Sequence, residues 1–288
     1  MYFADFFRNL FKRSNVGVLI YLILNLLLLF FLSGQGDISG FFVVLGVYLF
    51  SLVVALSPVG EAILRIQQGC KPITRQDILA KVEPLFRRVY EKAKNLDPSI
   101  PDGVKIYLNN DKAPNAFATG RKTICITKGL LSLSDEQIES TLAHEFGHLA
   151  HKDTDMLLVI SVGNLIVTFI FVATRLIINI TGILFSIINR SIGGLIATFL
   201  VDILFGLAMW SWTKIGTLLV LYSGRKNEFE ADEFAFKLGY GHGLAATLDI
   251  IAQHPPAHGL WKALYSTHPD TNDRIGKLQI LGVEYSRY

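Results

Sequence analysis

Long uncharged runs of apolar residues are the first pattern along this chain. Val16 to Leu32 contains 17 residues without a charge, and Phe41 to Pro58 is a second uncharged run of 18 residues. A helix needs about 17–25 apolar residues to cross the hydrocarbon core of a bilayer. We therefore predict that the two runs form a transmembrane hairpin near the N-terminus.

A third apolar stretch, from Met156 to Tyr222, is interrupted by only four charged residues: Arg175, Arg190, Asp202 and Lys214. The string Ser191 to Gly194 breaks this stretch, which predicts two helices at roughly 156–188 and 193–222. The sequence leaves open whether these helices fully cross the bilayer. Arg175 and Asp202 could be functional charges, but we interpret them as a packing pair or as snorkelling side chains.

The positive charges predict the orientation of the chain. The link at 33–40 has no lysine or arginine, whereas basic residues flank both uncharged runs: Arg8, Lys12, Arg13, Arg65, Lys71 and Arg75. By the positive-inside rule, the N-terminus and everything after about residue 60 lie on the cytoplasmic side. No clear Ala-x-Ala site follows the first run, so we interpret that run as a retained anchor and not as a cleaved signal.

The composition agrees with a membrane protein and gives no case for nucleic-acid binding. Hydrophobic residues make up 51% of the 288 residues, and the mean hydropathy is +0.42. The net charge is +3 without a basic tract, whereas nucleic-acid-binding domains carry clustered positive charge. Cys70 and Cys125 would lie in a reducing compartment, where neither needs a disulfide.

Between the apolar runs, the pattern predicts a mainly α domain with a small β-sheet. Helical spacing predicts a helix from Arg75 to Leu96 with a kink at Pro84. Val104 to Leu108 and Thr123 to Thr127 have strand character, and Asn115 to Gly120 could form the exposed edge of the sheet. Further helices should start near Asp135, after a capping box of Ser134 and Gln137, and cover Glu228–Leu238, Leu244–Ala252 and Thr271–Leu281.

His144-Glu145-Phe146-Gly147-His148, on the helix predicted from Asp135, indicates a catalytic metal site. Histidines one helical turn apart face the same side, so both imidazoles can reach one zinc ion. Glu145 projects beside the metal, where it can take a proton from water. His151 lies near the same face, but we interpret it as an exposed residue at the helix end.

A catalytic zinc site needs three protein ligands and one open position, so a third ligand must lie elsewhere. Glu228 and Asp232 are one turn apart on one helical face. Glu228 can therefore bind zinc, while Asp232 accepts a hydrogen bond from the free ring nitrogen of a ligand histidine. Glu230 points about 200° away and is expected in solvent. Alone, the three acids would indicate only a charged helix face.

Together these residues resemble the HtpX-like membrane metalloproteases, which are relatives of the CAAX prenyl endopeptidases. The resemblance covers most of the chain: the N-terminal hairpin, Asn115 to Gly120, His144 to His148, two apolar helices, Glu228 with Asp232, and Thr267-His268-Pro269 with Arg274. Asn227 departs from the pattern, which has a residue such as arginine just before the ligand glutamate.

The resemblance implies a gluzincin-type domain on the cytoplasmic side, with one Zn²⁺ ion per chain held by His144, His148 and Glu228. Glu145 would be the general base, and Asp232 would support a ligand histidine. An extended peptide would add as a strand along the segment that contains Asn115, Ala116, Phe117 and Ala118. His268 and Arg274 match positions that contact substrate or an oxyanion, although the residues alone equally allow a structural histidine and an exposed arginine.

We therefore predict a zinc endopeptidase of the cytoplasmic membrane that cuts misfolded or membrane proteins in quality control, with the lipid bilayer and protein substrates as partners. The expected organisation is a transmembrane hairpin (1–64), a first protease part (65–154), two hydrophobic helices (155–222) and a second protease part (223–288). A processing protease for lipidated or signal-like peptides and a non-catalytic membrane scaffold with structural zinc remain alternatives.

Overall fold

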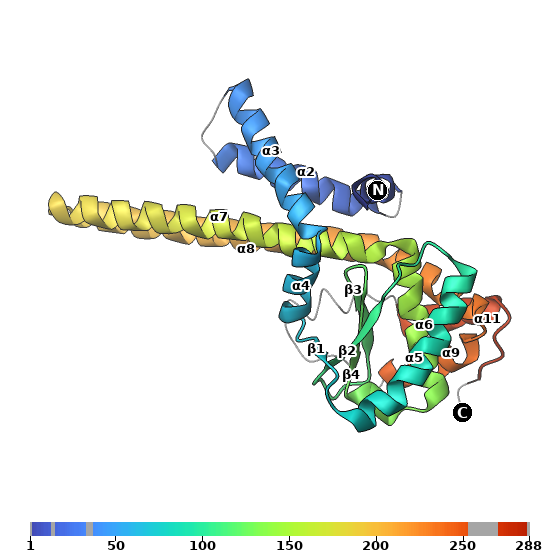
Figure 1. Ribbon diagram of the computed structural model, residues 1–288. Coiled ribbons are helices and arrows are strands. Elements are labelled where there is room, and N and C mark those ends of the chain that lie inside the picture. The colour runs from blue at the N-terminus through green and yellow to red at the C-terminus, as the bar shows by residue number, and fades with distance from the viewer. Residues whose placement is uncertain (1, 13–14, 33–36, 253–269, 287–288) are drawn as a thin grey trace.

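The computed structural model describes residues 2–12, 15–32, 37–252 and 270–286. It shows an N-terminal helical segment, a long two-helix arm, and a compact domain in which helices surround a small sheet (Figure 1). The prediction of a mainly α protein with a small sheet is therefore confirmed.

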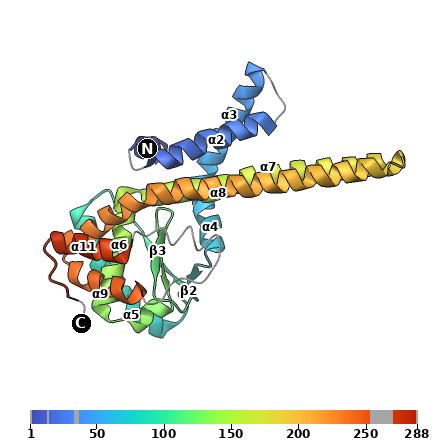
Figure 2. The ribbon, with the colours of Figure 1, turned by 180° about the vertical axis from the view of Figure 1, so that it is seen from behind.

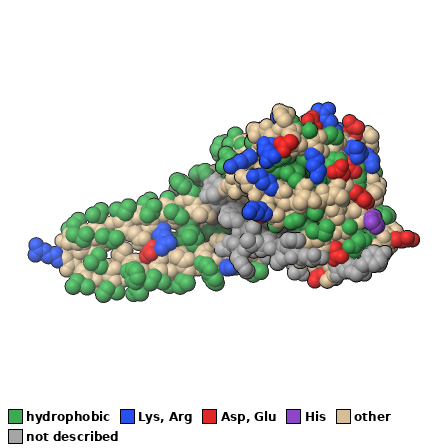
Figure 3. All heavy atoms as spheres, turned by 90° about the horizontal axis from the view of Figure 1, so that it is seen from below, with side chains coloured by type: hydrophobic (Ala, Val, Ile, Leu, Met, Phe, Trp, Pro, Cys, Tyr) green, Lys and Arg blue, Asp and Glu red, His purple; other side chains and the backbone are tan. Residues whose placement is uncertain are grey.

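The arm consists of α7 (Asp153–Ile188) and α8 (Ile192–Lys237), which lie side by side in both ribbon views (Figure 1 and Figure 2). Within them, Thr168–Ile188 and Ile192–Gly216 are long and apolar enough to cross a membrane. Apolar side chains cover the visible face of the arm (Figure 3), as a lipid-facing surface requires. The arm is therefore the main membrane element of the described chain.

α8 corrects one prediction from the sequence. We predicted an apolar helix at 193–222 and a separate helix from Glu228 to Leu238, but the structure has one continuous helix of 46 residues. No proline lies between the two parts, and Gly224 costs only about 1 kcal/mol in a helix. One rigid rod therefore joins the apolar arm to the compact domain.

The N-terminal segment has four helices: α1 (Tyr2–Leu10), α2 (Val16–Leu32), α3 (Ile38–Ala55) and α4 (Pro58–Gln67). Among them, α2 packs mainly against α8, whereas the other three pack against α7. α3 is also long and apolar enough to cross a membrane, whereas α2 contains a shorter apolar stretch. Trp212 of α8 donates its indole N–H to Asn25 of α2 at 3.0 Å. A Cβ at Gly216 would lie 2.4 Å from the Tyr21 ring, so this contact requires a glycine.

The sheet contains four strands: β1 (Lys71–Pro72), β2 (Lys105–Asn109), β3 (Ala116–Thr119) and β4 (Thr123–Thr127). Their order is β1-β2-β4-β3, with β2 parallel and β3 antiparallel to β4. β3 is therefore an edge strand, as predicted. Its Ala116 and Ala118 side chains are buried and not exposed, because this strand also packs against α6 (Asp135–His151).

Every second residue of β3 points its backbone N–H and C=O groups toward the edge that does not pair with β4. The Thr127 N–H donates to the Asn115 carbonyl, and Phe117 lies opposite Cys125. In an antiparallel ladder, the residues between such hydrogen-bonded pairs turn their N–H and C=O groups the other way. Ala116 and Ala118 therefore present their backbone groups away from β4.

The compact domain is completed by α5 (Gln76–Leu96), the short 3₁₀ helix η2 (Gly129–Ser132), α9 (Gly241–Ala252) and α11 (Thr271–Ile280). α5 continues through Pro84 as a helix. The Phe146 ring of α6 is fully buried and lies 5.5 Å from the ring centres of both Phe86 and Tyr90. Burial of Phe146 anchors one face of α6 in the core and leaves the histidine face for the site.

Candidate active site

Both ends of α6 are fixed by local sequence. The Ser134 hydroxyl accepts a hydrogen bond from the Gln137 N–H, and the Gln137 side chain accepts one from the Ser134 N–H. This capping box starts the helix where the sequence predicted it. At the other end Lys152 has a φ of 61°, in the left-handed region, and the chain turns there into α7.

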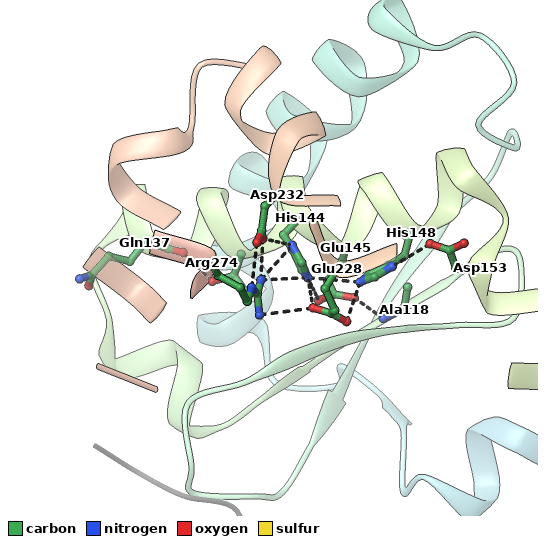
Figure 4. Close-up of polar contacts among 10 residues, drawn as sticks. Ala118, Gln137, His144, Glu145, His148, Asp153, Glu228, Asp232 and Arg274 are labelled. Carbon is green, nitrogen blue, oxygen red and sulfur yellow. Dashed lines mark hydrogen bonds and ion pairs between the residues drawn. The ribbon is translucent and has the colours of Figure 1, made fainter. Parts of the chain in front are cut away.

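α8 brings Glu228 against the two histidines of α6. The helices approach closely at Gly147, where an added Cβ would lie 2.8 Å from Ala231 Cα. The Glu228 carboxylate lies 3.4 Å from His144 Nε2 and 3.5 Å from His148 Nε2, and the two Nε2 atoms are 3.2 Å apart (Figure 4). The structure therefore joins residues separated by the whole arm into one group.

These three side chains can hold one zinc ion. Ligand atoms about 2.0–2.2 Å from zinc and at tetrahedral angles lie about 3.3–3.6 Å from one another. The two Nε2 atoms are 3.2 Å apart, Glu228 approaches His144 through Oε2 and His148 through Oε1, and one ligand atom from each residue lies within 4.8 Å of the others, so a small adjustment brings all three to one ion. Two imidazole nitrogens and one carboxylate oxygen also form the donor set of a catalytic zinc site, which keeps its fourth position open.

The electrostatics of the site favour a cation. Burial and the Arg274 charge lower the pKa of His144, but hydrogen bonds to Asp232 and Glu228 outweigh them and raise it above its ordinary value. Burial also lowers the pKa of His148, and contacts with Asp153 and Glu228 raise it well above the ordinary value. The buried carboxylates thus stabilise positive charge at the position that a metal ion would take.

Each ligand histidine uses its second ring nitrogen on a carboxylate. His144 Nδ1 lies 2.8 Å from Asp232, and His148 Nδ1 lies 3.2 Å from Asp153 (Figure 4). Such partners fix the orientation of a ligand imidazole. Asp232 had been proposed for this role, whereas sequence reasoning missed Asp153. The signal for it would have been an acid just beyond the end of the histidine helix.

Arg274 of α11 lies behind the ligands and is only 4% exposed. Its guanidinium donates to Asp232 at 2.6 and 2.8 Å and lies 3.3 Å from Glu228. Burial would raise the pKa of Asp232, but the Arg274 charge and hydrogen bonds hold it at about 2. The alternative of an exposed arginine is therefore wrong, because two buried carboxylates draw this side chain inward.

Glu145 lies between the ligand group and the edge of β3. One carboxylate oxygen accepts a hydrogen bond from the Ala118 N–H at 2.6 Å, and the other lies 4.0 Å from His144 Nε2 (Figure 4). Glu145 is also buried, so its carboxylate is held in place and shielded from solvent. It can therefore exchange a proton with a group that lies between the ligands and β3.

The other candidates lie in different surroundings. His151 is half-buried and not exposed, because its ring packs against Phe234 and its carbonyl accepts a hydrogen bond from Asn9 of α1. Glu230 is half-buried as well, although it was expected in solvent. His268, with Thr267 and Pro269, lies outside the described residues.

Comparisons with known proteins find similar membrane proteases. The chain is 28% identical to a protein named Protease HtpX homolog from Tropheryma whipplei (strain Twist), over 88% of this chain and 92% of that protein. It is 27% identical to Protease HtpX from Shewanella sp. (strain MR-4), over 68% and 72% of the two chains. The crystal structure of S. mikatae Ste24p matches with 21% identity and a TM-score of 0.44, over 90% of this chain and 61% of that chain.

A family-level comparison covers most of the compact domain and the arm. The model of Peptidase family M48 matches residues 80–281, which include every described ligand candidate and Glu145. Together with the relatives and the apolar helices, this match shows that the chain belongs to peptidase family M48, as an HtpX-like membrane metalloprotease.

Proposed function

We propose that this chain is a zinc endopeptidase that cuts membrane proteins, and misfolded ones in particular, on the cytoplasmic side of the cytoplasmic membrane. The observation that carries the proposal is the group of His144, His148 and Glu228 with Glu145 beside it. Each chain would hold one zinc ion. A structural site would close the fourth position with a protein ligand, whereas here Glu145 is positioned as a base.

The chemistry divides between the ion and the side chains. His144, His148 and Glu228 would hold the zinc ion, which would supply a water of lowered pKa, about 7, and Lewis-acid polarisation of the scissile carbonyl. Glu145 takes the proton of the attacking water and then delivers it to the leaving amine. Its hydrogen bond to the Ala118 N–H aims the carboxylate during both transfers. Asp232 and Asp153 hold the ligand imidazoles in one orientation.

The free edge of β3 supports the choice of a peptide substrate. The outward backbone groups of Ala116 and the Ala118 carbonyl can pair with an extended chain, which then runs past Glu145, while the Ala118 N–H holds the Glu145 carboxylate. Asn115 and Phe117 flank these positions and would contact substrate side chains. Arg274 would act through Asp232 and Glu228, whose carboxylates it binds.

The position of the site supports membrane substrates. Glu228 lies twelve positions along α8 from Gly216, where the apolar segment ends. At about 1.5 Å per helical residue the ligands lie about 18 Å beyond that segment. The basic residues that flank the N-terminal runs support a cytoplasmic site. Chain segments that leave the membrane on that side would therefore emerge close to the site.

The test uses the full chain, purified in detergent under chelator and then given zinc. We expect an unfolded casein-like substrate to be cut only with zinc, and Glu145→Gln to bind zinc but lose cleavage. A folded, zinc-loaded wild type that cuts neither casein nor membrane-inserted substrates would contradict the proposal. Equal rates for soluble and membrane-inserted substrates would contradict only the membrane preference.

A further inference from the structure

An ion pair lies midway along the arm, where the surroundings are apolar. Arg175 of α7 donates to Asp202 of α8 through Nε and, at 2.7 Å, through Nη2, and Asn179 donates to the same carboxylate. Figure 3 shows an acidic and a basic side chain together on the otherwise apolar arm. We name Arg175, Asn179 and Asp202 the arm polar cluster.

The cluster lies near the middle of the apolar part of α8. Arg190 at the tip of the arm and Lys214 at its base are the charged residues that bound the apolar part of α8. Asp202 is twelve residues from each, which is about 18 Å in either direction at 1.5 Å per residue. An arginine side chain cannot reach water across that distance, so snorkelling does not explain the cluster.

The cluster also keeps unused hydrogen-bonding capacity. α7 and α2 pack along part of the segment Ile192–Gly216, but no residue in an 18-residue window of it is buried, and the Arg175 and Asp202 side chains are 32% and 24% exposed. A guanidinium carries five N–H groups, and among the described residues the hydrogen bonds of Arg175 to Asp202 use Nε and Nη2 but not Nη1. Gly206 lies beside this guanidinium, where an added Cβ would be 3.7 Å from Arg175 Nη2, so this position contributes no side chain that shields it.

Helix packing alone does not require such a cluster. Two apolar side chains would join α7 and α8 without the cost of placing charges in hydrocarbon. Polar groups inside the membrane normally face another protein segment or a water-filled space. The exposed donors of Arg175 and the amide oxygen of Asn179 therefore match a polar side chain on an additional transmembrane segment.

We propose that the arm polar cluster docks the transmembrane segment of a substrate that carries a carboxamide or carboxylate side chain near mid-membrane. The inference rests on the proposed function and names its substrate class. Transmembrane segments expose such side chains to lipid when they lack the partner helices that normally cover them. The cluster would thus select unassembled membrane proteins.

The continuity of α8 favours a substrate over a second copy of this chain. A segment docked at Asp202 and lying along α8 leaves the apolar zone beside Gly216, about 18 Å from Glu228. An extended chain covers that distance in about five or six residues at about 3.3 Å each. A segment docked along α8 therefore leads directly to the cleavage site, and the cut falls at least about five residues beyond the membrane end of the segment.

The experiment compares two single-span reporters in phosphatidylcholine vesicles that contain the full, zinc-loaded chain. Both reporters have the same flexible cytoplasmic segment and a Leu/Ala span, with either asparagine or leucine at its centre. A hydrogen bond in the bilayer contributes about 0.6–2 kcal/mol, so we expect the asparagine reporter to be cut about 3- to 30-fold faster. A soluble peptide with the same cut site reports basal activity.

Two variants carry the test. Arg175→Leu combined with Asp202→Leu should cut both reporters at the slower rate and the soluble peptide at the wild-type rate. Asn179→Leu keeps the ion pair and should lower the preference for asparagine only in part. A matched control, Arg190→Gln at the tip, should keep the full preference because it lies outside the apolar zone.

Binding is read separately, by energy transfer between the arm and the reporters in the Glu145→Gln chain. Tighter binding of the asparagine reporter, lost in the double variant, supports docking even if no cleavage occurs and the proposed function fails. Equal binding and equal cleavage of both reporters would overturn docking while soluble-peptide cleavage still upholds the protease. Loss of all activity in the double variant, or loss of self-association without a change in preference, would also overturn it.

Discussion

Replacing Gly147 by alanine adds one methyl group at the closest approach of α6 and α8. The new Cβ would lie 2.8 Å from Ala231 Cα, whereas carbon atoms in contact lie about 3.5–4.0 Å apart. The two helices must therefore separate by roughly 0.7–1.2 Å. Glu228 is less than one turn from Ala231 on α8, so the separation moves this ligand away from His144 and His148.

The expected effect on stability is small and the effect on activity is large. Alanine is favoured over glycine in a helix by about 0.8–1.0 kcal/mol, and overpacking costs about 1–3 kcal/mol. The net loss of stability is then at most about 2 kcal/mol. A misplacement of about 1 Å in a catalytic group can cost about 100-fold in rate. Gly147→Ala should therefore lose zinc affinity and activity while the chain stays folded.

The assay measures zinc affinity by competition with a chelator, peptide cleavage at saturating zinc, and thermal unfolding. Gly276→Ala in α11 is the matched control, because no atom lies within 4 Å of its added Cβ. The control should keep full zinc affinity and activity. If Gly147→Ala binds zinc and cleaves peptide as the wild type does, the close approach at this glycine does not set the ligand geometry.

Three further changes probe the support of the site. Asp153→Asn should weaken zinc binding by about 10- to 100-fold, because His148 loses the carboxylate that orients it; unchanged affinity in a chelator titration would refute this. Asp232, whose pKa is lowered to about 2, contributes stability above its unfolded pKa of about 3.9, and this contribution is lost as the pH falls through about 2. Arg274→Gln should raise the pKa of Asp232, so the stability is lost at a higher pH, and should lower the free energy of unfolding by about 3–5 kcal/mol. Identical urea unfolding of the metal-free wild type and variant from about pH 3 to 6 would contradict the pairing of Arg274 with Asp232. Glu61→Ala should lower the free energy of unfolding by about 1–3 kcal/mol, because Glu61 accepts hydrogen bonds from the turn between β3 and β4. This turn holds the β3 edge proposed to bind substrate, so KM should rise more than kcat falls, and a change in kcat alone would oppose this reasoning.

Local signals in the sequence were sufficient for the helix that carries the histidines. The capping box of Ser134 and Gln137 sets where α6 starts, and helical periodicity places His144 and His148 on one side. The pairing of Glu228 with Asp232 followed from the same periodicity. These features depend on neighbours within one or two turns, which is why they could be predicted without a structure.

Features that depend on distant contacts could not be predicted in this way. Asp153 reaches His148 because Lys152 adopts a left-handed backbone conformation, which turns the chain between the two helices. The helical periodicity of the sequence does not continue across Lys152, so it could not predict this contact. The burial of Arg274 depends on carboxylates more than forty residues earlier in the chain. The continuity of α8 through residue 224 depends on packing at both of its ends, which outweighs the weak helix propensity of one glycine.

The order of the ligands along the chain has a consequence for biogenesis. During synthesis from the N-terminus, His144 and His148 are made 80 or more residues before Glu228, and the whole arm is made between them. A nascent chain that has not yet produced its arm holds two of the three proposed zinc ligands. The protease therefore cannot complete its metal site until the arm that anchors it in the membrane has been synthesised.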